Sequence, residues 1–324
     1  MKIFPKNARV IFLGSSITVG GWPMYVLDEY LRSQPERRVE MYSCGVSGGN
    51  VGVMLQNLEE NLRLYAPTHA VILIGINDVG RVLYTLPEGQ TCFTDASQKR
   101  LNERFARINV YCAGMRTLVE KLQARGIAVT LLSPNCYDES QHPDALREVG
   151  LDAALEYMGE MVRLLAEEKG CEYWNIHALL RQLYAVSDIC AEDRVHLTKP
   201  DGQMVLARLF LAGQGLAPMP DFTSEEALHA YLADCTQEKH PLLPPVAELF
   251  DMVFYLRRVL DGDFLVASQA GDVSEAERYA YVQKFRTDAK SFWLIIADAY
   301  LKDFANREKL AQEIIEKTRG IYGE

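Results

Sequence analysis

The sequence predicts an α/β protein: a three-layer α/β/α sandwich around a five-stranded parallel sheet, followed by a helical C-terminal extension. Two observations support this fold class. Up to about residue 215, short runs rich in β-branched residues alternate with longer amphipathic stretches, which is the pattern of βαβ units with right-handed crossovers. Beyond that point the alternation stops and helical patterns dominate. The 324 residues are enough for one α/β domain and a further unit.

Strands and helices are expected to alternate through the first part of the chain. The strands are expected at residues 8–14, 38–44, 69–75, 127–133 and 171–176. The helices are expected at residues 24–32, 51–64, 104–125, 151–169 and 202–211. The first strand, ARVIFLG, is apolar almost throughout, as expected where helices cover both faces of a sheet. Two long connections, 79–103 and 134–150, follow the third and fourth strands, and the first is expected to form a wall or lid of the ligand pocket.

The domain boundary is expected in the Gly- and Pro-containing stretch 213–221, which divides the chain into an α/β domain, 1–215, and a helical extension, 216–324. A capping box at Thr223–Glu226 predicts the start of a helix over 224–233. Further helices are expected over 246–260 and within 274–318. Aromatic side chains are expected to form a core of this extension or, as the alternative, a contact between copies of the chain: Phe250, Phe254, Tyr255, Phe292, Trp293 and Tyr300.

Composition excludes several classes of protein. The net charge of −10 argues against a nucleic-acid surface, which needs a basic face. The sequence has no apolar run of the roughly 18 residues that a membrane span requires and no leader pattern at its start, so a soluble cytoplasmic protein without membrane insertion is expected. The seven cysteines lack C-x-x-C spacing, which predicts reduced thiols and neither a disulfide framework nor a zinc site.

The segment GSSITVGG, residues 14–21, follows the first expected strand and partly matches three known motifs. A phosphate-binding P-loop is excluded because the glycine spacing is wrong and no lysine follows. A dinucleotide fingerprint is excluded because Ser16 stands where its second glycine belongs. The G-x-S-x-G elbow is nearer, but Thr18 replaces its last glycine. What remains is a candidate nucleophile, Ser16, near the start of a helix, where a helix N-cap serine is the alternative interpretation.

A serine hydroxyl needs a base to take its proton. His196 is the histidine with a carboxylate close enough in sequence to orient it. Asp193 lies three residues before it, so a tight turn can place the carboxylate on Nδ1 and direct Nε2 toward the serine. Asp188 and Asp201 are rival carboxylates without this short spacing. His177 is expected at the start of a helix and is assigned no chemistry.

Two further expected strand ends supply hydrogen-bond donors for an oxyanion. The segment GVSGGN offers the backbone N–H of Gly48, where the absence of a Cβ allows close approach. The segment GIND offers the side-chain amide of Asn77. Both positions are also compatible with ordinary turns.

The ordered set GSSIT, GVSGG, GIND and DRVH resembles the SGNH hydrolases, also called the GDSL-type lipase/esterase family, over residues 8–212. The resemblance implies a flavodoxin-like SGNH fold, Ser16 as nucleophile, His196 as general base and then acid, and Asp193 as the residue that orients it. It also implies an oxyanion hole formed by the Ser16 and Gly48 N–H groups and the Asn77 side chain. One departure is Ser15, which stands where the family has the aspartate of its G-D-S motif.

The function that this resemblance implies is hydrolysis of a carboxylic ester through an acyl-enzyme, with no metal and no organic cofactor. A small acyl group, such as an O-acetyl group on a carbohydrate, is expected, because the connection 79–103 carries only scattered apolar residues for a longer chain. Alternatives are a lysophospholipase or thioesterase with the same site, or a weakly active member that binds a ligand or partner. A small-molecule ester is the expected partner, and the C-terminal helices are the candidate surface for a homo-oligomer.

Overall fold

The computed structural model of the chain describes residues 1–324 except 89, 91–92, 94–97, 139–147, 237 and 243–324. Its described part contains a parallel sheet in the order β2-β1-β3-β4-β5. The strands are β1 (Arg9–Gly14), β2 (Glu40–Gly45), β3 (His69–Leu73), β4 (Ala128–Leu132) and β5 (Glu172–Trp174). This strand order is that of flavodoxin-like folds, so the predicted fold class is confirmed.

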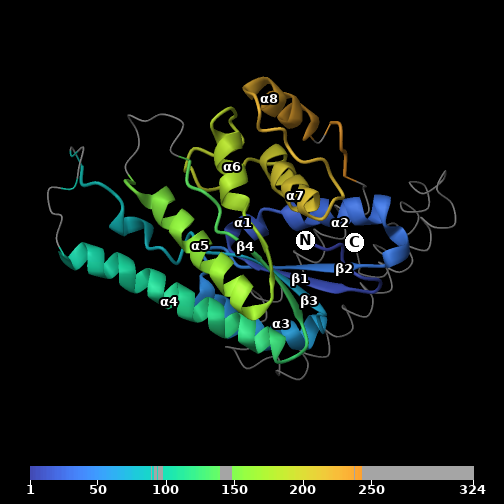
Figure 1. Cartoon of the computed structure of the whole chain (residues 1–324), viewed down its shortest axis with the longest axis horizontal. Helices are drawn as coiled ribbons and strands as arrows, with labels where there is room; N and C mark the ends of the chain where they lie inside the picture. Colours follow the sequence, from blue (N-terminus) through green and yellow to red (C-terminus); the bar gives the residue numbers. More distant parts are fainter. Residues whose placement is uncertain (89, 91–92, 94–97, 139–147, 237, 243–324) are drawn as a thin grey trace, which may run out of the picture.

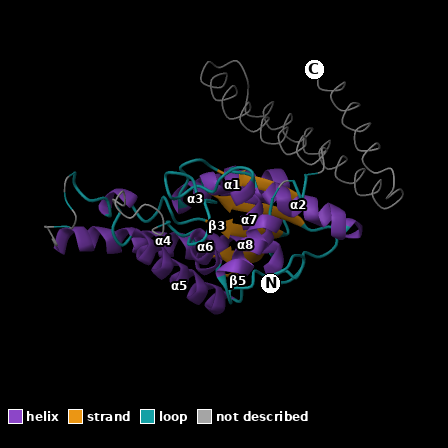
Figure 2. Ribbon diagram, turned by 90° about the horizontal axis from the view of Figure 1, so that it is seen from above, coloured by secondary structure: helices purple, strands orange, loops and turns teal. Residues whose placement is uncertain are grey.

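Helices cover both faces of the sheet, as the parallel strand order requires (Figure 1). They are α1 (Ser16–Val19), α2 (Trp22–Ser33), α3 (Val51–Tyr65), α4 (Gln98–Gln123), α5 (Leu151–Lys169), α6 (Ile176–Tyr184), α7 (Asp201–Gly213) and α8 (Glu225–Asp234). α3, α4 and α5 pack side by side on one face. α2 and α7 pack together on the other face, and Figure 2 looks down on this layer over the strands.

The central strand β1 holds the hydrophobic core together. The side chains of residues 10–13 are fully buried between the two helical layers, and each large apolar side chain contributes about 1.5–3 kcal/mol when buried. Trp22, at the start of α2, packs edge-on against Phe12 with ring centroids 5.0 Å apart. This contact fixes β1 and α2 relative to each other, on either side of α1, which begins at Ser16.

Close packing at the carboxyl end of β1 explains the glycine that ends the strand. A Cβ on Gly14 would lie 2.1 Å from Oγ1 of Thr18 and 2.7 Å from the carbonyl oxygen of Leu73. A side chain at this position would therefore push α1 away from the strand end. The glycine lets α1 fold directly over the sheet edge and present Ser16 there.

Helix α8 lies in the described part of the predicted extension. It packs against the α/β part of the chain, since its Leu228 and Tyr231 belong to the same hydrophobic core. The predicted capping box at Thr223–Glu226 is wrong by one residue. The N-cap is Ser224, whose Oγ accepts from the N–H of Ala227 at 3.2 Å. Thr223 is instead held in the preceding turn, where its N–H donates to Asp221. The boundary at residue 215 stays a prediction.

Some sequence-based expectations fall on residues outside the described part. They comprise the helices over 246–260 and 274–318, with their aromatic residues, and Cys92. The other six cysteines are free thiols. Among the helices of the described residues, none combines the length and the apolar character that crossing a bilayer would take.

Candidate active site

Ser16 is the first residue of α1, directly beyond the carboxyl end of β1. The N-cap position belongs to Ser15, whose side chain makes no capping hydrogen bond and is buried. The alternative interpretation of Ser16 as an N-cap serine is therefore wrong, and the Ser16 hydroxyl is not used to cap the helix. The first N–H groups of a helix have no partner within that helix, which suits them to bind an anion.

Ser16, His196 and Asp193 form one hydrogen-bonded row at the carboxyl edge of the sheet. Oγ of Ser16 lies 2.6 Å from Nε2 of His196. Nδ1 of the same ring lies 2.5 Å from Oδ2 of Asp193. A carboxylate only accepts hydrogen bonds, so it favours the tautomer with the proton on Nδ1 and leaves Nε2 as an acceptor for the serine hydroxyl.

The loop of residues 190–198, called here the acid–base loop, builds the histidine–aspartate pair from local contacts. Arg194 adopts a left-handed conformation with φ of 61°, which is uncommon outside glycine. The turn lets Oδ1 of Asp193 accept from the N–H groups of Val195 and His196, at 3.1 and 3.0 Å. Both carboxylate oxygens of Asp193 are therefore occupied before any substrate binds.

These contacts decide the electrostatics of Asp193. Partial burial by itself would raise the pKa of its carboxyl, but the hydrogen bonds from His196 and Val195 outweigh it, and the pKa lies below its ordinary value. The carboxylate is consequently ionised at neutral pH. Its rivals lie elsewhere: Asp201 begins α7, and Asp188 lies before the acid–base loop.

The two predicted oxyanion donors lie in adjacent loops. Nδ2 of Asn77 donates to the carbonyl oxygen of Gly49 at 2.9 Å, and a side-chain amide has a second N–H for a ligand. Gly48 is exposed and has φ of +70°, while a Cβ there would meet nothing within 4 Å. The backbone conformation, rather than close approach by protein atoms, thus explains the glycine at position 48.

Asp78 is a site residue that the sequence reasoning missed. Its Oδ1 accepts from the N–H of Val51 at the start of α3, at 2.9 Å. The residue is only 8% exposed, and burial raises the pKa of its carboxyl to about 6. Together with the bond from Asn77 to Gly49, this contact joins the two loops that carry the donors. Its partner lies 27 residues away in sequence, so no local pattern indicates the contact.

Within the described stretches, no three residues among His, Cys, Asp and Glu come together as a metal-binding group. A serine, a histidine and an aspartate in one row on an α/β fold are the constellation of serine hydrolases, which recurs on unrelated folds.

Comparison with known proteins agrees with this class. The GDSL-like lipase/acylhydrolase family matches residues 12–200, more than half of the chain. An acetylxylan esterase from Geobacillus stearothermophilus is 28% identical over an alignment of 226 residues, and the match covers 64% of this chain and 93% of that protein. The chain therefore belongs to the GDSL-like lipase/acylhydrolase family and is a carboxylic ester hydrolase.

Solved structures show the same fold. A gut microbial diltiazem-metabolizing enzyme superposes with a TM-score of 0.58 at 22% identity, over 66% of this chain and 48% of that chain. The present chain thus spans about half the length of that enzyme. A catalytic mutant of the acetylxylan esterase from Geobacillus stearothermophilus superposes with a TM-score of 0.52 at 24% identity, over 68% of this chain and all of the other.

Proposed function

We propose that this protein is a serine esterase that removes small acyl groups, chiefly acetyl groups carried on carbohydrate, through a Ser16–His196–Asp193 triad and an acyl-enzyme. The observation that carries the proposal is the continuous row from Oγ of Ser16 through His196 to Asp193, with separations of 2.6 and 2.5 Å. No metal or organic cofactor takes part in the proposed reaction.

In the first half of the reaction, Oγ of Ser16 attacks the ester carbonyl carbon while its proton passes to Nε2 of His196. The negative charge on the carbonyl oxygen is stabilised by the N–H groups of Ser16 and Gly48 and by Nδ2 of Asn77. The intermediate collapses as the bond to the alcohol oxygen breaks, and that oxygen takes the proton from His196. The alcohol leaves and the acyl group stays on Ser16.

In the second half, water replaces the alcohol. His196 takes a proton from water, the water oxygen bonds to the acyl carbon, and the same donors stabilise the second oxyanion. The bond to Ser16 Oγ then breaks, and Oγ takes the proton back from His196. The carboxylic acid leaves, and the enzyme returns to its starting state.

The apolar residues of the connection 79–103 favour a small acyl group. Tyr84 and Leu86 are buried in the protein, with 3% and 7% exposure. Phe93 lies beneath the guanidinium groups of Arg100 and Arg104. Val82 and Leu101 are the exposed large apolar side chains in the described part of this segment, and two such side chains offer little surface to a long acyl chain. The acetyl preference also rests on the similarity to the acetylxylan esterase, whose length the chain matches almost fully.

The proposal is tested by comparing wild type, Ser16→Ala and Ser15→Ala on p-nitrophenyl acetate, butyrate and octanoate and on acetylated xylo-oligosaccharides. Wild type should prefer acetyl esters, Ser16→Ala should fall by about 10⁴-fold or more, and Ser15→Ala should keep most of its activity. Equal rates for wild type and Ser16→Ala would overturn the mechanism. A preference for octanoate would favour a lysophospholipase or thioesterase.

A further inference from the structure

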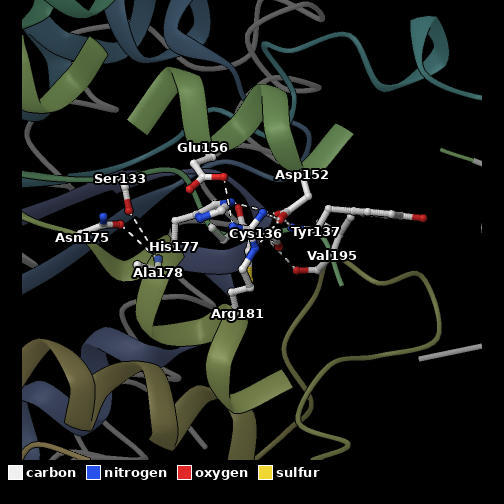
Figure 3. A network of polar contacts seen from close by, with 11 residues as sticks. Ser133, Cys136, Tyr137, Asp152, Glu156, Asn175, His177, Ala178, Arg181 and Val195 are labelled. Carbon is white, nitrogen blue, oxygen red and sulfur yellow. Dashed lines mark hydrogen bonds and ion pairs between the residues drawn. The ribbon is translucent and has the colours of Figure 1, made fainter. Parts of the chain in front are cut away.

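A cluster of polar side chains joins α5 to α6 (Figure 3). The cluster, called here the buried ion cluster after its buried aspartate and histidine, consists of Asp152, His177 and Arg181, whose side chain is 46% exposed. Oδ1 of Asp152 lies 3.0 Å from Nε2 of His177, and Oδ2 accepts from Nε of Arg181 at 2.8 Å and from its Nη2 at 2.5 Å. The side chains of Asp152 and His177 are each 3% exposed. Burial of an aspartate and a histidine is costly unless they are paired, so such a cluster is expected to have a specific role.

The cluster is not a second active site. Cys136 lies next to it, but the thiol is fully buried and burial raises its pKa well above the ordinary value. A buried thiol of this kind is inert. The role of the cluster must therefore be sought in what it holds in place.

The cluster holds the segment that leaves β4, residues 133–138, called here the β4 exit segment. The N–H of Tyr137 donates to Oδ1 of Asp152 at 2.8 Å. At the start of the segment, Oγ of Ser133 accepts from the N–H of His177 at 2.8 Å. Both ends of the segment are thus fixed to α5 and α6 through Asp152 and His177.

The β4 exit segment in turn holds the acid–base loop. Nδ2 of Asn135 donates to the carbonyl oxygen of Val195 at 3.3 Å. The N–H of Asp138 donates to the carbonyl oxygen of Arg194 at 3.0 Å, and Nη1 of Arg194 donates back to the carbonyl oxygen of Asp138 at 3.0 Å. The loop residues in these contacts, Arg194 and Val195, lie between Asp193 and His196 in the chain.

A second route runs from the same segment to the proposed triad aspartate. The hydroxyl of Tyr137 donates to Glu148 at 2.5 Å. Glu148 forms an ion pair with Nε of Arg81 at 2.7 Å. Nη2 of Arg81 donates to the carbonyl oxygen of Asp193 at 3.2 Å. Tyr137 therefore couples the buried ion cluster to the backbone of Asp193.

We propose that Asp152 is a positioning residue for the triad: it fixes the β4 exit segment so that the acid–base loop keeps His196 at hydrogen-bonding distance from Ser16. The inference rests on the proposed function of that triad. Small displacements of a reacting group can cost about 10²-fold in rate. Asp152 acts through Tyr137 and does not touch the substrate.

The test compares Asp152→Asn with Glu160→Gln, a matched control. Glu160 also lies on α5 and pairs with an arginine, but at the surface. In Asp152→Asn the amide NH2 group must face either the N–H of Tyr137 or the guanidinium of Arg181, both of which are donors, so one anchor is lost. The variant should therefore lower kcat for p-nitrophenyl acetate by about 10- to 100-fold with KM changed less than two-fold, and Glu160→Gln should match wild type. Asp152→Asn with the kcat of Glu160→Gln would overturn the proposal.

A spectroscopic readout separates positioning from general loss of stability and does not need turnover. The proton between Nδ1 of His196 and Asp193 should give a low-field signal in the proton NMR spectrum, identified by its loss in Asp193→Ala. In Asp152→Asn this signal should shift or broaden, while in Glu160→Gln it should stay. An unchanged signal would overturn the positioning role.

Two variants keep the test informative if Asp152→Asn does not fold. Asn135→Ala and Arg81→Ala each remove one link to the acid–base loop and leave the buried ion cluster intact. Each should lower kcat with little change in KM, and the double variant should lower it further. Wild-type rates in the double variant would overturn the proposal. If wild type hydrolyses no ester but the NMR signal still responds to Asp152→Asn, the proposed function fails and the positioning role stands.

Discussion

Two aspartates at the same edge of the sheet, Asp78 and Asp193, have opposite electrostatics. Burial opposes ionisation in both and is the largest single influence on each pKa. The pKa of Asp78 accordingly rises to about 6, whereas the pKa of Asp193 lies below its ordinary value despite burial. Asp193 accepts two backbone N–H bonds and contacts the ring of His196. Oδ2 of Asp78 has no hydrogen-bond partner within the described part of the chain.

The difference shows that hydrogen-bond donors, rather than position at the sheet edge, decide which of the two carboxyl groups ionises more easily. The acid–base loop supplies Asp193 with donors from its own turn, so the carboxylate stays charged beside His196. Asp78 receives its donor from Val51 of α3 and joins two loops. We therefore propose that Asp193 orients His196 and that Asp78 has a structural role.

The largest expected effect comes from neutralising Asp193. Asp193→Asn should lower kcat by about 10⁴-fold, because an amide can select the wrong histidine tautomer. Steady-state kinetics on p-nitrophenyl acetate measure this loss, with unchanged circular dichroism as the check on folding. A loss no larger than that of Asp188→Asn would contradict the assignment.

The next effect tests the donor side of the site. Asn77→Ala should lower kcat by about 10²–10³-fold, because one oxyanion donor is removed. Asn50→Ala is the matched control: Asn50 caps α3 through a bond to Val53, so its loss should cost about 1 kcal/mol of stability and little activity. Similar kinetics for the two variants would argue against an oxyanion role for Asn77.

Asp78 should affect stability more than rate. Its pKa of about 6 in the folded protein lies above the ordinary value of 3.8, so the folded state holds this proton longer than the unfolded state. The free energy of unfolding should therefore fall by about 3 kcal/mol as pH rises from 4 to above 6. In Asp78→Asn, which keeps an acceptor for Val51, this contribution should vanish. Urea unfolding at several pH values measures it, and identical slopes in both proteins would refute it.

The smallest effect is the opposite pH dependence at Asp193. Its pKa lies below the ordinary value, so its contribution to stability is present above pH 4 and is lost as pH falls through the folded pKa. The contribution should be modest because the side chain is 42% exposed. Asp193→Asn should become slightly less sensitive to acid in the same urea experiment, whereas greater sensitivity would contradict the sign.

Much of the fold could be predicted because its signals are local. The apolar run before Ser16 identified β1, and the spacing of Asp193 and His196 indicated their contact. α4 was expected at residue 104 but begins at Gln98. Its first turns extend beyond the sheet (Figure 1). A helical segment that buries no face has no periodic pattern of apolar residues, so the sequence does not show where this helix begins.

The supporting contacts of the site could not be predicted in the same way. Asp78 meets Val51 from 27 residues away, and Asp152 meets His177 from 25 residues away. Contacts at these separations depend on the strand order, which a periodic pattern does not contain. His177 was correctly expected at the start of a helix, in α6, yet its buried partner became visible only in three dimensions.

The most direct test of the account is covalent labelling of the serine in wild type, Asp193→Asn and Asp78→Asn with a fluorophosphonate, followed by mass spectrometry of the peptides. Label is expected on Ser16, with slow labelling in Asp193→Asn and near wild-type labelling in Asp78→Asn. Label on Ser15 or another serine, or equal rates in wild type and Asp193→Asn, would contradict it.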